Sequence, residues 1–340
     1  MVTTTELARL AGVSQSTVSR VLTGNPHVSP GTRERVLRAL ETHFPEADPK
    51  VLAVNRTGNV GVATSDITNP YFPELLESLE ENARARGLNL VLWNERDPSL
   101  PATTAGVRSG IVDGVLFTNA TGASSAAIQR IVDRGTPCVL VNRGLHHLGV
   151  DQVTSDNAQI GRLAADYLLD HGRHSIGMVV GPEDTEAVVE RRESFLQQLW
   201  DRAGVDVRRG AIHRGPPTFE TGFAAAGELL EQGVDSIFCI NDLLALGALA
   251  GLNRLGVRVP EDVWLVGVDG LPMAAWAGFD LTTIRQPLEE ITRRAFELLR
   301  ERIDESGERP RVETFPGELI VRGSTASAPL RDPGEGPDQG

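Results

Sequence analysis

Apolar residues recur at helical spacing in three short stretches of the first 44 residues, which predicts three helices. Gly12 and the turn Gly24-Asn25-Pro26 are expected to end the first two, because glycine favours a left-handed backbone and proline cannot continue a helix. Ser14 is expected to cap the second helix, and Ser29 with Pro30 to begin the third. The three apolar sets are Leu7, Ala8, Leu10 and Ala11; Val18, Val21 and Leu22; and Val36, Leu37 and Leu40.

The second of these helices carries polar residues away from its apolar stripe, namely Gln15, Ser16, Ser19 and Arg20. Two helices joined by a glycine turn, the second polar and capped by serine, are typical of a helix-turn-helix. Glutamine can pair with adenine and arginine with guanine, while serine and threonine contact base edges or phosphates. An ordinary three-helix bundle with a solvated face has the same pattern, so the pattern by itself leaves both interpretations open.

From residue 59 onward, apolar runs of strand length alternate with helix-like stretches. This alternation indicates parallel sheets with helices on both faces, and two doubly wound subdomains fit the length better than one sheet. Strands are predicted at 59–64, 88–93, 114–119, 137–142, 176–181, 236–240 and 263–268. Helices are predicted at 72–86, 124–135, 157–171, 186–203, 221–232, 242–255 and 287–305.

Polar residues follow most of these strands, where open α/β sheets bind their ligands. Asparagine and aspartate are common among them and suit a hydroxyl-rich or otherwise polar ligand. The alternative is that they simply cap the helices that follow, and of Asn241 and Asp242 we expect one to cap and the other to face the ligand. The strand-end residues are Thr64-Ser65-Asp66, Asn94, Asn119, Asn142-Arg143, Asn241-Asp242 and Asp269.

Charge is distributed unevenly along the 340 residues. The net charge is −13, but residues 1–60 carry about +2 and the remainder about −15. A mildly basic head on an acidic body can still bind phosphates locally. Lys50 is the only lysine, so almost all basic charge is arginine, which makes forked contacts to phosphate and guanine. Cys138 and Cys239 lie within apolar runs and are expected to be buried, reduced thiols in strands.

Several other classes of protein lack support in this sequence. It has no apolar run long enough to span a membrane and no secretory signal at its start, so a cytoplasmic location is expected. The His146-His147 and His171/His174 pairs lack metal-ligand partners at suitable spacing, and no phosphate-loop lysine or nucleophile elbow occurs. We therefore expect neither an enzyme nor a cofactor. The tail, 326–340, is predicted to be disordered and has no heptads.

With these motifs in order, the sequence resembles the LacI/GalR family of bacterial repressors over about residues 3–325. The head motif runs from Leu7 to Leu22. The motifs of the body are Asp66-Ile67-Thr68-Asn69-Pro70-Tyr71-Phe72, Ser155-Asp156-Asn157, Asn241-Asp242-Leu243-Leu244-Ala245-Leu246-Gly247-Ala248, Val259-Pro260-Glu261-Asp262-Val263, Val266-Gly267-Val268-Asp269, Leu281-Thr282-Thr283-Ile284-Arg285-Gln286-Pro287 and Glu318-Leu319-Ile320-Val321-Arg322-Gly323-Ser324-Thr325.

The resemblance implies a homodimer whose heads read the two halves of a palindromic DNA operator, with a small-molecule effector, expected to be a sugar, held between two periplasmic-binding-protein-like subdomains. Gln15, Ser16 and Arg20 match base-contacting positions. The residues that match phosphate-contacting or capping positions are Thr5, Ser14, Thr17, Ser19 and Asn25, and Leu52 matches the minor-groove wedge. The residues that match the effector site are Asp66, Tyr71, Phe72, Asn142, Arg191, Asn241 and Asp269.

The implied domains are a head at 1–44, a hinge at 45–58 and an effector-binding and dimerisation domain at 59–325. The N-subdomain is expected at about 59–157 and 287–315, and the C-subdomain at about 158–286 and 316–325. The alternative class is a sugar-binding protein without operator function, which would need an export signal and no helical head; neither condition is met.

Three departures from the family pattern concern these sites. Pro49 stands where the family hinge is helical, so we expect a shorter hinge helix that begins with Asp48 as its N-cap. His43-Phe44 replaces the usual Gly-Tyr before the hinge. Pro217 occupies the place of a stacking aromatic residue, and Phe219 is the candidate to supply that face instead.

Overall fold

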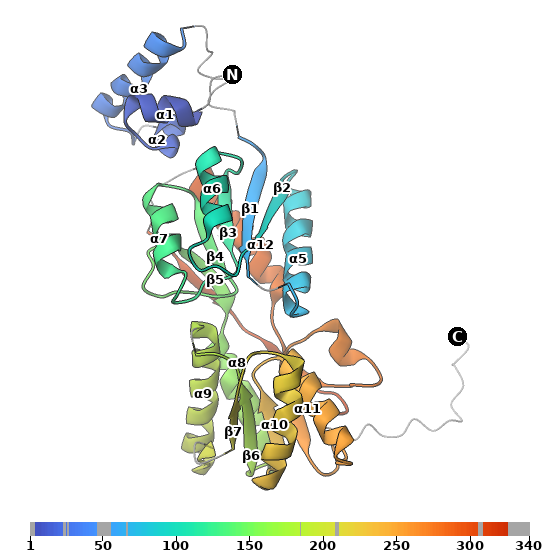
Figure 1. Cartoon of the computed structure of the whole chain (residues 1–340). Coiled ribbons are helices and arrows are strands. Elements are labelled where there is room, and N and C mark those ends of the chain that lie inside the picture. Colours follow the sequence, from blue (N-terminus) through green and yellow to red (C-terminus); the bar gives the residue numbers. More distant parts are fainter. Residues whose placement is uncertain are drawn as a thin grey trace, which may run out of the picture. The chain divides into compact units, whose positions relative to one another are not determined.

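The computed structural model describes residues 4–22, 25, 27–45, 56–65, 67–183, 185–207, 211–304 and 309–325 (Figure 1). Four predicted features lie outside these residues: the hinge around Pro49 with Leu52, the Asp66 site, the side chain of Thr5 and the tail. Two compact units divide the chain. Unit 1 comprises Met1–Ile67, Leu76–Val153 and Ile291–Glu313, and unit 2 comprises Thr68–Leu75, Thr154–Glu290 and Thr314–Gly340.

The head forms the three predicted helices, α1 (Thr4–Ala11), α2 (Gln15–Leu22) and α3 (Pro30–His43). Ser14 caps α2, since its Oγ accepts a hydrogen bond from the backbone N–H of Thr17 over 3.1 Å. Ser29 caps α3 in the same way through Thr32, and Gly12 has the left-handed φ of 67° that ends α1. Leu37 departs from the prediction and is 37% exposed, because only Val36 and Leu40, four residues apart, face the core of the head.

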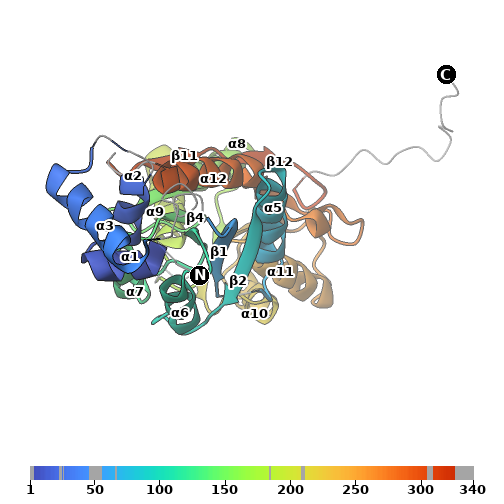
Figure 2. The ribbon, with the colours of Figure 1, turned by 90° about the horizontal axis from the view of Figure 1, so that it is seen from above.

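The sheet of unit 1 has six strands in the order β11-β5-β4-β3-β1-β2. Pairing is parallel from β5 through β4, β3 and β1 to β2. Figure 2 shows α5 and α12 over one face of this sheet and α6 and α7 over the other. The strands are β1 (Asn59–Thr64), β2 (Asn89–Asn94), β3 (Gly114–Phe117), β4 (Cys138–Val141), β5 (Asp151–Ser155) and β11 (Val312–Phe315), and the helices are α5 (Tyr71–Ala85), α6 (Pro101–Ser109), α7 (Ser125–Asp133) and α12 (Leu288–Asp304).

The sheet of unit 2 has six strands in the order β12-β10-β9-β8-β6-β7. All pairs are parallel except β10 with β12. Its strands are β6 (Ile176–Val180), β7 (Ile212–Arg214), β8 (Ser236–Cys239), β9 (Trp264–Asp269), β10 (Thr282–Arg285) and β12 (Glu318–Ile320). Its helices are α8 (Asn157–Asp170), α9 (Glu186–Ala203), α10 (Phe219–Glu231), α11 (Asp242–Arg254) and the short 3₁₀ helix η2 (Pro272–Ala275). The predicted fold class, a helical head with two doubly wound sheets, is confirmed.

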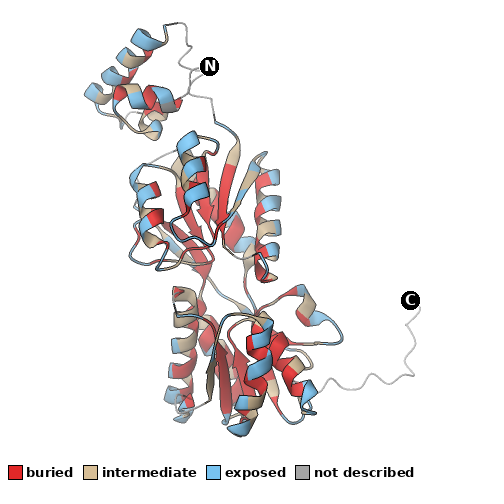
Figure 3. Cartoon of the chain, in the orientation of Figure 1, coloured by how far each residue is buried: buried red, intermediate tan, exposed pale blue. Residues whose placement is uncertain are grey.

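The inner strands of both sheets are buried while the helices expose one side, as Figure 3 shows. The edge strands β2, β7, β11 and β12 consist of intermediate and exposed residues. The predicted strands and helices all form, but five further strands, α6 and the short η2 were not predicted. β5 was missed because its buried sequence, Asp-Gln-Val-Thr-Ser, is almost wholly polar. α6 was missed because its first turn is capped from a distance: Glu95 accepts hydrogen bonds from the backbone N–H groups of Ala102 and Thr103.

Cys138 in β4 and Cys239 in β8 are buried free thiols, as predicted, and burial raises the pKa of both. Among the described residues, no group of three or more histidines, cysteines or carboxylates gathers as metal ligands. None of the described helices is long and apolar enough to cross a membrane.

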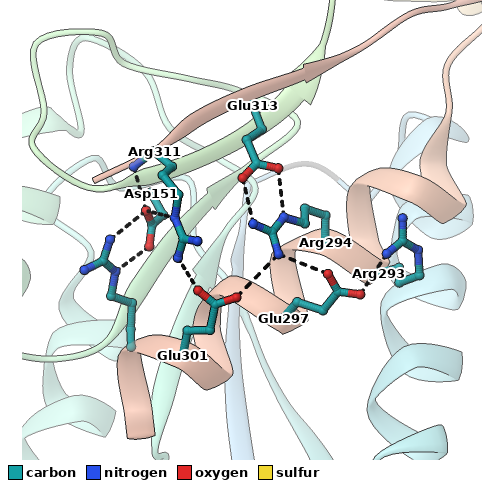
Figure 4. Close-up of polar contacts among 8 residues, drawn as sticks. Asp151, Arg293, Arg294, Glu297, Glu301, Arg311 and Glu313 are labelled. Carbon is teal, nitrogen blue, oxygen red and sulfur yellow. Dashed lines mark hydrogen bonds and ion pairs between the residues drawn. The ribbon is translucent and has the colours of Figure 1, made fainter. Parts of the chain in front are cut away.

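One carboxylate of unit 1 is completely buried within a network of ion pairs (Figure 4). The guanidinium of Arg302 in α12 makes a bidentate ion pair with Asp151 in β5. Its Nε and Nη2 donate hydrogen bonds to the two carboxylate oxygens over 2.5 and 2.9 Å. The backbone N–H of Arg311 donates to the same carboxylate over 2.8 Å. A second bidentate ion pair joins Arg294 to Glu313, in which Nε and Nη2 each donate to one carboxylate oxygen over 2.8 Å. The network therefore fastens β5 and β11 to α12.

We predict that Arg302→Met lowers the free energy of unfolding by about 3–5 kcal/mol, because it leaves the buried Asp151 charge without its arginine. The matched control is Arg300→Met on the same helix, since Arg300 is 74% exposed and its pair with Asp304 is worth at most about 0.5 kcal/mol. Urea denaturation followed by circular dichroism measures both. Equal losses in the two variants would contradict the assigned role of the bidentate ion pair.

In unit 2, α10 and α11 approach so closely that glycine is required at their contact. A Cβ on Gly222 would lie 1.9 Å from the carbonyl oxygen of Leu244, and one on Gly247 would lie 2.0 Å from that of Phe219. Both clashes would be with backbone atoms, which cannot be relieved by a change of side-chain rotamer. The spacing of these two helices thus depends on small residues.

We predict that Gly247→Ala destabilises the protein by about 1–3 kcal/mol through overpacking. Gly227→Ala in α10 is the control: its Cβ would meet only Leu255 Cδ1 at 3.9 Å, so the lower backbone entropy of alanine should stabilise the helix by about 0.5–1 kcal/mol. Urea denaturation should therefore show opposite signs for the two substitutions. A stabilising Gly247→Ala would disprove the close approach.

Candidate effector and nucleic-acid sites

The predicted DNA-reading residues lie on the accessible side of α2. Gln15 is exposed, and Ser16, Ser19 and Arg20 are partly exposed, whereas Val18 and Val21 are buried against the other two helices. Because of the helical periodicity, these polar side chains share one face of α2, opposite the buried valines.

Hydroxyl groups gather at the N-terminus of α2. Ser14 Oγ lies 2.9 Å from Ser16 Oγ and 2.7 Å from Thr17 Oγ1. Asn25 lies in the turn after α2, where its carbonyl oxygen accepts from Arg33 Nη2 over 2.6 Å and its Oδ1 accepts from the backbone N–H of His27. The helix N-terminus and these hydroxyls form a donor-rich end of the kind that phosphate groups bind.

Unit 2 includes the first residues of α5 and the last residues of β5, and in it a buried glutamine connects three polar segments of the chain. Gln286 follows β10 and donates from Nε2 to Asp269 Oδ1, at the end of β9, over 2.7 Å. Its Oε1 accepts a hydrogen bond from Ser155 Oγ over 2.7 Å and a longer one from the hydroxyl of Tyr71 over 3.4 Å. Of these residues, Tyr71 and Asp269 were predicted as effector contacts, and the structure brings them onto one common partner.

Arg191 lies beside this group on α9 and is also buried. Its Nη1 donates to the carbonyl oxygen of Ile240 over 2.5 Å, and its Nη2 donates to Asn157 Oδ1 over 2.7 Å. Within the described part of the chain, the Nε atom of Arg191 is buried without a hydrogen-bond partner. Burial lowers the pKa of this guanidinium, while the charge of Asp269 opposes that change. A buried N–H group without an acceptor lowers the stability of the folded protein and is uncommon. A hydrogen-bond acceptor on a ligand would compensate for this loss.

Two carboxyl groups share this environment. Asp242 accepts hydrogen bonds from Thr283 Oγ1 over 2.6 Å and from the backbone N–H of Leu271 over 2.9 Å, and burial raises its pKa to about 6. Burial, and then the charge of Asp242, raise the pKa of Asp269 to about 8. Asp269 also has a φ of 135°, a strained value for a residue other than glycine.

The remaining predicted effector residues have different surroundings. Asn241 caps α11, since its Oδ1 accepts from the backbone N–H of Leu244 over 2.8 Å, and its neighbour Asp242 is fully buried. Phe72 is buried edge-on against Tyr71. Phe219 begins α10, is 37% exposed and stacks on Phe223. Asn142 belongs to unit 1, where it follows β4 with a left-handed φ of 69°.

Three residues of this network were quoted in the family motifs but were not predicted as site residues: Ser155, Asn157 and Gln286. Ser155 ends β5 and Gln286 follows β10, so the strand-end rule applies to both. The rule did not reach them because neither strand was recognised: β5 is almost wholly polar, and β10, with the sequence Thr-Thr-Ile-Arg, has a single apolar residue.

We predict that Asp269→Asn makes stability less dependent on pH between about pH 6 and 8. The carboxyl pKa is raised in the folded state, so its contribution is complete at low pH and is lost as pH rises toward about 8. Each pH unit in this window should cost the native protein at most about 1.4 kcal/mol, and the neutral amide should abolish that loss. Urea denaturation at pH 6, 7 and 8 measures the difference between the two proteins. A constant difference would mean that Asp269 stays ionised beside Arg191.

Comparisons with known proteins identify the two domains. Residues 3–43 match the family described as bacterial regulatory proteins, lacI family, and residues 165–325 match the periplasmic binding protein-like domain. The chain is 32% identical over 335 residues to the HTH-type transcriptional regulator MalR of Streptomyces coelicolor, covering 95% of this chain and 96% of the relative. It is 30% identical over 333 residues to the HTH-type transcriptional repressor PurR of Pasteurella multocida, covering 96% of this chain and 99% of that protein.

Among solved structures, the complex of the transcriptional regulator CelR with cellobiose is similar, with a TM-score of 0.72 and 32% identity over 95% of this chain and all of the other. These relatives are regulators and not enzymes, as expected for this chain. The resemblance noted in the sequence is confirmed over almost its full length. The chain belongs to the LacI family of bacterial transcriptional regulators.

Proposed function

We propose that this regulator is a repressor that binds a palindromic operator as a homodimer, and that a sugar or similar small polar effector controls this binding. The observation that carries the proposal is the exposed polar face of α2, with Gln15 and Arg20 on a head whose net charge is opposite in sign to that of the body. Contacts to phosphates supply affinity, and contacts to base edges supply specificity.

A dimer is supported by the small size of one head. A single helix-turn-helix reads only a few base pairs, and two heads on a palindrome double the contacts and define a half-site spacing. The similarity to a protein named as a repressor supports repression rather than activation.

A polar effector is supported by the buried group around Gln286 and Arg191. Amide, carboxyl and guanidinium groups in fixed positions can hydrogen-bond sugar hydroxyls, and the ring of Tyr71 lies beside them. The similar structure of CelR was solved with cellobiose. If the effector and the operator prefer different conformations of the protein, each lowers the affinity for the other. The factor is the same in both directions because one coupling free energy links the two sites.

The test is a fluorescence-anisotropy titration of the purified protein against its own promoter region, across a salt series. We expect tight binding that weakens steeply with salt, and a 5- to 150-fold loss for Arg20→Ala, equivalent to about 1–3 kcal/mol for one base contact. Arg84→Ala is the control, because Arg84 is an exposed residue of α5 outside the head.

Repeating the titration with cellobiose and with a panel of other sugars and nucleosides tests the effector. We expect one sugar to shift the midpoint, and the direction of the shift distinguishes an inducer from a co-repressor. If no promoter DNA binds while a sugar does, the protein is a sugar sensor without direct operator function. Equal losses for Arg20→Ala and Arg84→Ala would contradict the assignment of α2 as the DNA-reading helix.

A further inference from the structure

One side chain on the polar face of α2 is held by the neighbouring helix. Gln15 begins α2 and is exposed, whereas Thr4 begins α1 and is only 7% exposed. The Gln15 Nε2 atom donates a hydrogen bond to Thr4 Oγ1 over 2.9 Å. A buried hydroxyl of α1 is thus bound to the amide of a residue that the proposed function assigns to base reading.

This contact leaves the glutamine amide with a definite set of free groups. A carboxamide carries two N–H donors and one oxygen acceptor. Thr4 accepts from one N–H, and among the described residues no further hydrogen bond involves this amide, which leaves the second N–H and Oε1 for a base. One donor and one acceptor on the same amide are what the N7 and N6 positions of adenine require in the major groove.

We propose that Thr4 is a positioning residue: it orients the Gln15 amide for adenine and so takes part in determining the operator sequence. The inference rests on the proposed function, because it assumes that α2 enters the major groove. It adds to the residues that determine base preference one that lies on α1 and not on the DNA-reading helix α2.

The physical reason is preorganisation. An unrestrained glutamine has several rotatable bonds, and fixing them when the base pair forms lowers affinity. Threonine is β-branched and has few rotamers on a helix, and here its side chain is also buried, so it is a rigid partner. The bond joins residues 11 positions apart, which means that the packing of α1 on α2 determines the direction of the amide.

The experiment selects sequences from a randomised duplex DNA library with the full-length protein. Thr4→Val removes the hydroxyl and keeps the shape of the side chain. We expect wild type to select a palindrome with adenine at the base pair that Gln15→Ala identifies. At that pair alone, Thr4→Val should lower the preference for adenine about 3- to 10-fold, the effect of one neutral hydrogen bond. The matched control is Thr42→Val at an exposed position of α3, which should change no preference.

Two further variants separate positioning from folding of the head. Thr4→Ser retains the hydroxyl and should restore the adenine preference. In the Gln15→Ala background, Thr4→Val should have no additional effect on base preference, because the amide that it positions is gone. Thermal unfolding of each variant by circular dichroism reports the stability of the head independently.

Two results would overturn the inference: a Thr4→Val protein with wild-type base preferences, or one whose affinity falls equally for every sequence. Failure of the proposed function has a different signature, since wild type would then select no sequence at all. In that case the inference about Thr4 fails with it.

Discussion

Parallel pairing of strands is the constraint on which the rest of this structure depends. In unit 2, β8, β9 and β10 run side by side in one direction, so the residues that follow them leave the sheet at the same edge. Asp242, Asp269 and Gln286 meet there although 17 to 44 residues separate them in sequence. Once buried together, these groups must satisfy one another, and the hydrogen bonds around Gln286 are the result.

The buried ionisable groups described in units 1 and 2 are stabilised in different ways. Asp151 in unit 1 is matched by the bidentate ion pair with Arg302 and by a backbone N–H, so its charge is compensated within the network. In unit 2, two carboxyls share the environment of Arg191, whose own hydrogen bonds go to Ile240 and Asn157. The pKa values of both carboxyls are raised accordingly. Incomplete compensation and the strained backbone of Asp269 are features that folds retain at ligand sites more often than in structural cores.

The head follows different rules because its structure is mostly local. Serine caps, a left-handed glycine and apolar residues three or four apart are sufficient to specify α1, α2 and α3. The same local rules place the polar side chains of α2 on its solvent-accessible face. Side chains must be accessible in this way to contact bases in a groove. The contact between Thr4 and Gln15 is an exception, since it depends on how two helices pack and not on either helix separately.

By itself, the sequence determined the fold class, the position of the head, most strands and helices, the buried thiols and the family. These features depend on periodicity, capping and motifs, which are properties of neighbouring residues. Only the tertiary structure revealed β5, whose polar residues are buried because they bond to groups far away in the chain, such as Arg302. It likewise decided that Asn241, and not Asp242, caps α11, and it revealed that Gln286 is the centre of the polar group. Periodicity carries no signal for such contacts, because they form between residues that become neighbours only when the strands pair.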